Sequence, residues 1–251
     1  MSGHSKWSSI KHKKGAADAK RGKLFTKLAR AITVAARDGG GSPDANPALA
    51  LAVQKARDAS MPKDNIQRAI DRGTGAGGDA QAIESVTYEG YGPGGAAIMA
   101  EALTDNRNRT GAEVWHAFER HGGSLGEPGS VAWQFENRGV ILIDGERYTE
   151  DDLMPAIDAG AQDVTEDGDL LKITTAASDL AAVRSTLEEA GVEVQSAEPS
   201  MEPKATVVVG ESDAPALLRL MDALEEHDDV DSVHANFDVP EEILEKAAAA
   251  S

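Results

Sequence analysis

Basic side chains are concentrated in the first 37 residues of this 251-residue chain. This stretch holds ten Lys or Arg residues and a single acid, Asp18, whereas the whole chain has a formal net charge of −18. Cations gathered on an acidic background favour binding of a polyanion, because each cation that pairs with a phosphate releases condensed counterions. We expect nucleic acid to contact this region through Lys6, Trp7, Lys11, His12, Lys13, Lys14, Lys20, Arg21, Lys23, Lys27 and Arg30.

We expect Trp7, Arg107 and Arg109 to bind nucleic acid for reasons other than the positive charge of the N-terminal stretch. Trp7 can stack on an unpaired base, an interaction worth about 1 to 3 kcal/mol, or it can pack against the body of the protein. Arg107 and Arg109 are two of the four basic residues between 73 and 138, and they stand near the start of an expected helix. Cations are unfavourable at that end of a helix dipole, so solvation alone does not explain their placement. We expect both arginines to extend the nucleic-acid-binding surface.

The sequence lacks the cysteines and the histidine spacing of common catalytic and metal sites. There is no cysteine, and the six histidines lack an H-E-x-x-H spacing. The spelling G-x-G-x-x-G occurs at 73–78 and at 90–95. The first follows an expected helix and the second lies between two expected strands, so neither has the strand–loop–helix context of a dinucleotide site. We expect no catalytic residue, metal ligand, cofactor or small-molecule substrate.

Hydropathy and cysteine usage bear on the compartment. The longest uninterrupted apolar run, 48–53, is far shorter than the roughly 18 residues that a membrane span needs. The absence of cysteine fits a reducing environment. We expect a cytoplasmic protein that makes no membrane contact.

Three helices are expected to position the N-terminal basic residues. From Asp18 onward the apolar residues fall on one helical face and the cations on another. The apolar set is Leu24, Phe25, Leu28, Ile32 and Ala35, and the cationic set is Lys23, Lys27, Arg30 and Arg37. The glycines at 39–41 end this helix, Asn46 and Pro47 begin a second, and a third covers 63–72. Residues 1–75 are therefore predicted to form a basic helical domain with a flexible arm at 1–17.

The remainder of the chain predicts two α/β units. Between 136 and 204 the order is strand, helix, strand, strand, helix, strand, with a turn at Asp167-Gly168 and helix caps at Thr149 and Ser178. Prolines at 199 and 203 are expected to mark its end. On each side of this unit lies a shorter strand–helix–strand segment that cannot bury its own apolar surface. These expected strands cover 97–103, 131–135, 205–209 and 230–237.

We therefore predict an α+β multidomain fold with an N-terminal helical domain and two ferredoxin-like α/β domains. One of these is split between 80–135 and 205–240, and the other, at 136–204, is inserted into it. Residues 139–251 carry a net charge of −22, which we interpret as solvated acidic surface.

Short motifs spread along nearly the whole chain resemble those of the YebC/PmpR family. These motifs are Met1-Ser-Gly-His-Ser-Lys-Trp7, Lys11-His-Lys-Lys14, Arg21-Gly-Lys-Leu-Phe25, Met61-Pro-Lys-Asp-Asn-Ile66, Tyr88-Glu-Gly-Tyr-Gly-Pro93, Leu103-Thr-Asp-Asn-Arg-Asn-Arg-Thr110 and Asn236-Phe-Asp238. The resemblance implies three domains, one helical and two α/β, and a non-enzymatic regulator of gene expression. Family members are described as DNA-binding transcriptional regulators, and bacterial and mitochondrial relatives as translation factors. The mitochondrial relative is the translational activator of cytochrome c oxidase.

Two kinds of nucleic-acid partner remain open on the sequence alone. The face that carries Lys23, Lys27 and Arg30 can contact phosphates, but it has no Asn or Gln to read base edges. Phosphate contacts position a protein on nucleic acid without specifying a sequence. A DNA-binding transcriptional regulator and a ribosome-associated factor that binds ribosomal RNA are both consistent with this face.

Overall fold

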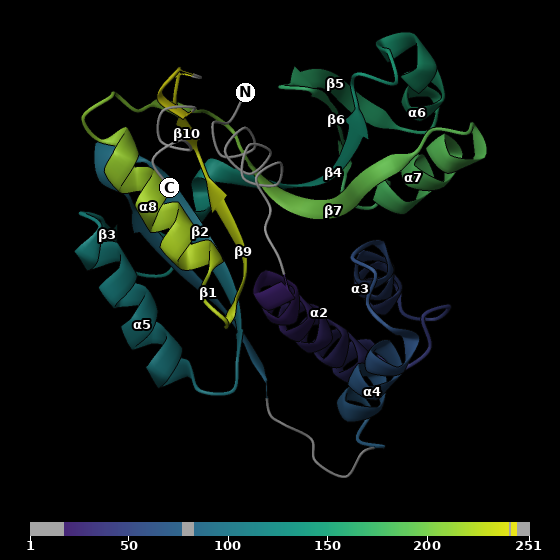
Figure 1. Ribbon diagram of the computed structural model, residues 1–251, viewed down its shortest axis with the longest axis horizontal. Coiled ribbons are helices and arrows are strands. Elements are labelled where there is room, and N and C mark those ends of the chain that lie inside the picture. The colour runs from purple at the N-terminus through teal and green to yellow at the C-terminus, as the bar shows by residue number, and fades with distance from the viewer. Residues whose placement is uncertain (1–17, 77–82, 241, 245–251) are drawn as a thin grey trace.

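The computed structural model describes residues 18–76, 83–240 and 242–244 (Figure 1). The predicted arm at 1–17, with Lys6, Trp7, Lys11, His12, Lys13 and Lys14, lies outside the described residues, as does the side chain of Lys20. The described part is a mixture of helices and antiparallel sheets. None of its helices is long and apolar enough to cross a membrane.

The N-terminal region is a bundle of the three expected helices, α2 (Asp18–Gly39), α3 (Pro47–Asp58) and α4 (Lys63–Gly73). The N-cap prediction at Asn46 is confirmed, since its side chain accepts a hydrogen bond from the Leu49 amide at 3.1 Å. Gly40 follows α2 with a φ of 88°, a conformation that favours glycine. Ile32 and Leu49 are fully buried between the helices, while Leu24, expected on the buried face, is 43% exposed.

The helices α2 and α4 pack in close contact at one glycine. A Cβ atom on Gly73 would lie 2.3 Å from the backbone oxygen of Thr33 and 2.8 Å from the side chain of Ala36. Any side chain at this position would force the two helices apart. Gly73 therefore fixes how closely the end of α4 approaches the middle of α2.

The first sheet joins segments from both ends of the rest of the chain. Its strands are β1 (Glu84–Tyr91), β2 (Ala97–Thr104), β3 (Ser124–Leu125) and β9 (Val230–Ala235), paired antiparallel in the order β3-β1-β2-β9. A 3-10 turn at Pro93–Gly95 connects β1 to β2, as expected for the hairpin. Helices α5 (Arg107–Arg120) and α8 (Ala214–Glu225) pack on one face (Figure 1). The strands β8 (Val207–Val208) and β10 (Phe237–Asp238) form a separate parallel pair.

The strand predicted at 131–135 is wrong. Ala132–Gln134 forms a 3-10 helix, and the strand begins only at Phe135. The cause is the buried carboxylate of Glu89, which accepts hydrogen bonds from the amides of Gly129, Val131 and Ala132 at 2.7 to 2.8 Å. Amides bonded to a carboxylate are not available to a β-ladder. Burial alone would raise the pKa of Glu89, but these three amides hold it below its usual value.

The second sheet contains β4 (Phe135–Asp144), β5 (Ala161–Asp167), β6 (Leu170–Ala176) and β7 (Val194–Pro203) in the antiparallel order β5-β6-β4-β7. Its helices are α6 (Met154–Asp158), preceded by a 3-10 turn at Glu150–Leu153, and α7 (Leu180–Glu189). The cap at Thr149 and the turn at Gly168, with φ 65°, are confirmed. Asp179, not Ser178, precedes α7. Of the two prolines expected to mark the end of this unit, Pro199 lies within β7, whereas Pro203 is its last residue.

The helical region lies against both sheets (Figure 1). On the side of the second sheet, Lys55 pairs with Glu198, and Arg184 approaches Asp58 at 3.3 Å. On the side of the first sheet, α2 lies beside the end of α8 and the start of β9. This second contact brings together the residues that the sequence singled out.

Candidate nucleic-acid interface

The cationic face of α2 contacts the C-terminal end of α8. Lys23, Lys27 and Arg30 lie one turn apart, so helical geometry places them in one stripe, which we call the α2 stripe. Lys27 Nζ donates to the carbonyl of Glu225 at 2.6 Å, and Arg30 Nη1 donates to that of Asp228 at 2.7 Å. Lys23 Nζ lies 3.4 Å from the carbonyl of Glu226.

This contact has a simple electrostatic cause. The last carbonyls of a helix lack intrahelical partners and carry the negative end of the helix dipole, so cations are favourable there. The stripe supplies Lys23 and Lys27 to the end of α8, and Arg30 to the turn that follows it. Burial lowers the pKa of Lys27, although nearby acids, Asp231 first among them, oppose that shift. The α2 stripe thus has a structural role in joining the N-terminal helices to α8.

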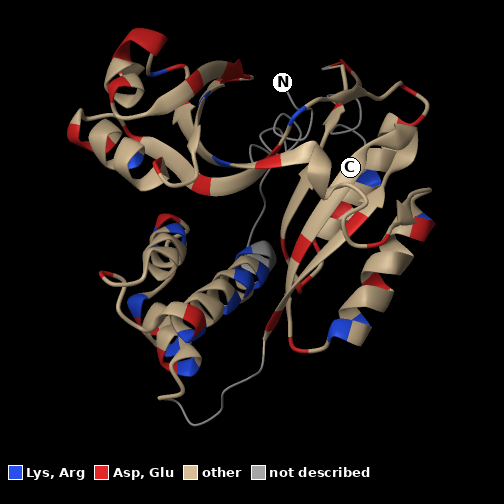
Figure 2. Cartoon of the chain, turned by 180° about the vertical axis from the view of Figure 1, so that it is seen from behind, with Lys and Arg blue, Asp and Glu red and all other residues tan. Residues whose placement is uncertain are grey.

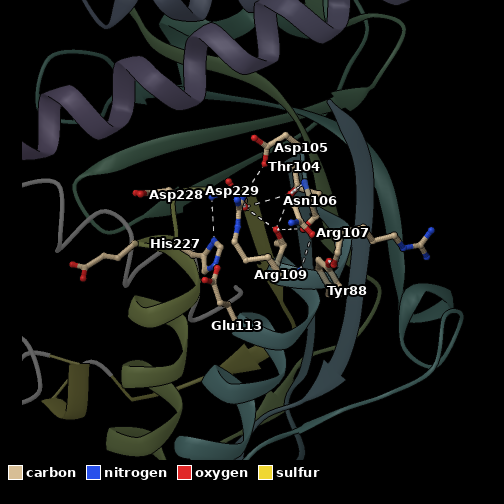
Figure 3. A network of polar contacts seen from close by, with 12 residues as sticks. Tyr88, Thr104, Asp105, Asn106, Arg107, Arg109, Glu113, His227, Asp228 and Asp229 are labelled. Atoms are coloured by element: carbon tan, nitrogen blue, oxygen red, sulfur yellow. Dashed lines mark hydrogen bonds and ion pairs between the residues drawn. The ribbon is translucent and has the colours of Figure 1, made fainter. Parts of the chain in front are cut away.

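A buried carboxylate extends this junction (Figure 3). The side chain of Asp229, just before β9, is only 4% exposed. Its Oδ1 lies 2.6 Å from Arg30 Nη1, and its Oδ2 lies 2.6 Å from Arg109 Nη2 and 2.7 Å from Thr110 Oγ1. We call Arg30, Arg109, Thr110 and Asp229 the Asp229 cluster.

The Asp229 cluster strongly lowers the pKa of the Asp229 carboxyl group. Burial alone would raise the pKa of Asp229. The hydrogen bonds from Thr110 and Arg109, together with the charges of Arg30 and Arg109, outweigh burial and lower the pKa to about 2. The carboxylate is therefore ionised throughout the physiological range and binds two arginines from two different parts of the chain.

The cluster explains the unfavourable position of Arg109. Helix α5 begins at Arg107, and the side chain of Asn106 caps it by accepting from the Arg109 amide at 3.1 Å. The guanidinium of Arg109 contacts Asp105 at 3.0 Å and Asp229 at 2.6 Å, which compensates for its place at the positive end of the helix. Arg107 does not join this arrangement, since its side chain points away from the cluster (Figure 3).

Glu113, His227 and Asp229 bring three possible metal-ligating atoms within 4.8 Å of one another. Each of these groups already has a partner in the chain. His227 Nδ1 accepts from the Asp229 amide at 3.1 Å, and its Nε2 lies 2.8 Å from Glu113 Oε2. Since two arginines already neutralise Asp229, we assign neither a metal nor a catalytic role to this group.

The structure therefore separates the predicted binding residues. Lys23, Lys27 and Arg30 form one stripe, and Arg109 joins them through Asp229, while Arg107 and Arg21 are exposed elsewhere. Asp229 was not predicted, although two arginines at a helix start were a signal that an anion should lie nearby. Binding of nucleic acid by any of these side chains stays a prediction.

Comparisons with known proteins identify the family models and relatives that this chain matches. The N-terminal domain model of the TACO1/YebC proteins matches residues 5–76, and the model of their second and third domains matches residues 83–237. A "Probable transcriptional regulatory protein" of Rubrobacter xylanophilus is 61% identical over 249 residues, covering 99% of this chain and 100% of its own length. A protein of the same description from Dictyoglomus thermophilum is 52% identical over 247 residues, covering 98% of this chain and 99% of its own.

A solved structure has the same fold. The crystal structure of the conserved hypothetical protein Aq1575 from Aquifex aeolicus has a TM-score of 0.83 and 45% sequence identity, covering 90% of this chain and 94% of its own. The chain belongs to the TACO1/YebC family, as the motifs at Met1–Trp7 and Leu103–Thr110 indicated.

Proposed function

We propose that this protein is a non-enzymatic regulator of gene expression that binds nucleic acid through its N-terminal region. The observation that carries the proposal is the placement of charge: Lys and Arg gather on α2, α3 and α4 in a chain with net charge −18 (Figure 2). The relatives named as probable transcriptional regulatory proteins support a regulatory role. The arm at 1–17 adds four lysines to the same end of the chain.

A test removes charge from the arm. We expect Lys11, Lys13 and Lys14 changed together to Ala to weaken binding to labelled oligonucleotides, measured by fluorescence anisotropy. Each lost phosphate contact should flatten the log–log salt slope by about 0.7 for single strands and about 0.9 for duplex DNA.

The matched control changes Arg120, Arg147 and Arg219 to Ala, which removes the same charge from dispersed exposed positions outside the N-terminal region. Equal affinities for the arm variant and this control would refute a specific role of the arm.

A second candidate, binding of ribosomal RNA as a translation factor, is favoured by the orientation of α2. Its cationic face contacts α8 through Lys27 and Arg30, so it is not presented as a recognition helix for the major groove. Contact with phosphates and unpaired bases does not require such a helix.

Sedimentation of a cell lysate through sucrose, with and without nuclease, separates the two candidates. Nuclease-sensitive migration with ribosomal particles would favour translation. A protein that stays at the top of the gradient and crosslinks to defined promoter DNA would favour transcription.

We also propose the domain organisation that the sequence predicted, with one change. The order β5-β6-β4-β7 supports a ferredoxin-like unit at 136–204, inserted between 80–135 and 205–240. The pairing of β2 with β9 supports a domain formed from both flanking segments, and residues 1–75 form the third. Since the strand expected at 131–135 is not in the first sheet, we propose the ferredoxin-like description for the inserted unit alone.

A further inference from the structure

A groove of about 360 Å³ lies between α2 and α4, on the N-terminal bundle. Its apolar lining includes Phe25, Ala29 and Met61, and its polar lining includes Asn65, Arg68 and Arg72. Among the residues that the structure describes, no Asp or Glu lines it. The lining supplies an apolar floor, one amide and three guanidinium groups, of which that of Arg30 is already paired with Asp229. Such a groove suits a ligand that has a flat apolar part and a negative charge.

The sequence creates this groove through residue size and helical spacing. Phe25 and Ala29 are one turn apart on α2, and Asn65, Arg68 and Arg72 follow one face of α4 at i, i+3 and i+7. Small side chains at Ala29 and Ala69 leave the space between the helices open. The long polar side chains of α4 therefore border an apolar floor.

Arg68 and Arg72 differ from the arginines at positions 30, 37 and 109, which have acidic partners. Arg30 and Arg109 bind Asp229, and Arg37 binds Asp38 at 2.7 Å. Arg68 and Arg72 are exposed, and no residue in the described ranges forms an ion pair or hydrogen bond with either guanidinium group. Both groups are free to bind an anion, and the planar fork of arginine matches a phosphate.

We infer that this groove binds one unpaired nucleotide of a single-stranded nucleic acid. The base lies on Phe25 and Met61, the amide of Asn65 faces the base edge, and Arg68 and Arg72 hold the adjacent phosphate. An unpaired base is required, because bases in a duplex are already stacked on their neighbours. The inference rests on the proposed nucleic-acid-binding function and gives it a site that includes a base-reading side chain, which the α2 stripe lacks.

The test compares two double variants with the same loss of charge. Arg68→Gln/Arg72→Gln removes the two groove arginines that have no acidic partner, while Arg57→Gln/Lys63→Gln removes two exposed cations of the same bundle outside the groove. The full chain is titrated against labelled 12-nucleotide RNA and DNA single strands and the matching duplexes by fluorescence anisotropy. Circular dichroism and melting temperature show whether each variant is folded.

We expect the groove variant to bind single strands about tenfold more weakly than wild type, with a salt slope lower by about 0.7 for the one phosphate that both arginines hold. The control should lose about threefold or less, because it lacks only long-range attraction. Asn65→Ala should reduce the difference in affinity between oligo(A), oligo(C) and oligo(U) while leaving the salt slope unchanged. Comparison of the RNA and DNA single strands identifies which polymer supplies the nucleotide.

Equal losses in the groove and control variants would overturn the groove site and leave the proposed function standing. Equal losses for duplexes and single strands in the groove variant would overturn the requirement for an unpaired nucleotide. A wild-type chain that binds none of the oligonucleotides would overturn the proposed function, and the groove site with it.

Discussion

Two sets of cations on neighbouring helices have opposite situations. The α2 stripe of Lys23, Lys27 and Arg30 is bound to the end of α8 and to Asp229. Arg68 and Arg72 on α4 line a groove to which none of the acids in the described part of the chain contributes. In a charge count made from the sequence, each residue of either set contributes one positive charge. The difference shows that packing decides which cations hold the fold together and which are available to a partner.

The comparison is sharpest at Asp229, where one carboxylate holds α2 and α5 to the start of β9. We expect Asp229→Asn to lower the free energy of unfolding by about 2 to 3 kcal/mol, because it leaves the charges of Arg30 and Arg109 without their buried counter-ion. Urea denaturation followed by circular dichroism measures this loss.

The matched control is Asp228→Asn at the adjacent, exposed carboxylate, whose ion pair with Lys23 is 3.4 Å long. We expect that change to cost less than about 0.5 kcal/mol. If the two variants are equally stable, the Asp229 cluster does not hold the α2 stripe in place.

The pH dependence of this stability gap tests the same carboxylate. Its pKa is lowered from 3.8 to about 2 on folding, so the unfolded chain takes up the proton first as pH falls. The contribution of Asp229 is fully present above about pH 4 and is lost as pH falls towards 2, over a range worth about 2 kcal/mol. The gap between wild type and Asp229→Asn should therefore narrow between pH 5 and pH 2.

Urea midpoints for both proteins at pH 5, 3 and 2 measure this gap. Titration of the other carboxylates, shared by the two proteins, largely cancels in the difference. A gap that stays constant with pH would show that the charge of Asp229 is not what stabilises the junction.

Smaller changes within the α2 stripe separate stability from binding. We expect Lys27→Met to cost about 0.5 to 1 kcal/mol, because half-buried Lys27 donates to the last turn of α8 at 2.6 Å. Lys23→Met should change stability by less than about 0.5 kcal/mol, since Lys23 is exposed. Urea denaturation and oligonucleotide anisotropy are measured on both variants. If Lys27→Met loses more affinity for oligonucleotides than Arg68→Gln/Arg72→Gln, then the α2 stripe, and not the pair on α4, is the set that binds nucleic acid.

Residues close together in the sequence were sufficient to predict several helix ends and turns of the fold. Asn46 before Pro47 predicted the start of α3, and the glycines at 39–41 predicted the end of α2. The turn at Asp167-Gly168 was predicted in the same way. In each case the residues that determine the structure are neighbours along the chain.

The sequence does not reveal features that a distant residue decides. Glu89 converts an apparent strand some 40 residues later into a 3-10 helix, which no local pattern reveals. The acceptors of the α2 stripe lie about 200 residues further along the chain, so a helical face suited to phosphate binding was found in contact with α8. Arg109 was expected on the nucleic-acid-binding surface and binds Asp229 in the structure, although its unfavourable place at a helix start was a local signal that an anion lies nearby.

The sequence separation of 199 residues between Arg30 and Asp229 also has a consequence during synthesis. Chains grow at about 5 to 20 residues per second, so roughly 10 to 40 s pass between the appearance of these two residues. Until α8 has been made, near the end of that interval, the α2 stripe has none of the α8 carbonyls to bind. A chain that is still being synthesised therefore exposes more cationic surface than a finished one, beside the RNA of the ribosome that is making it.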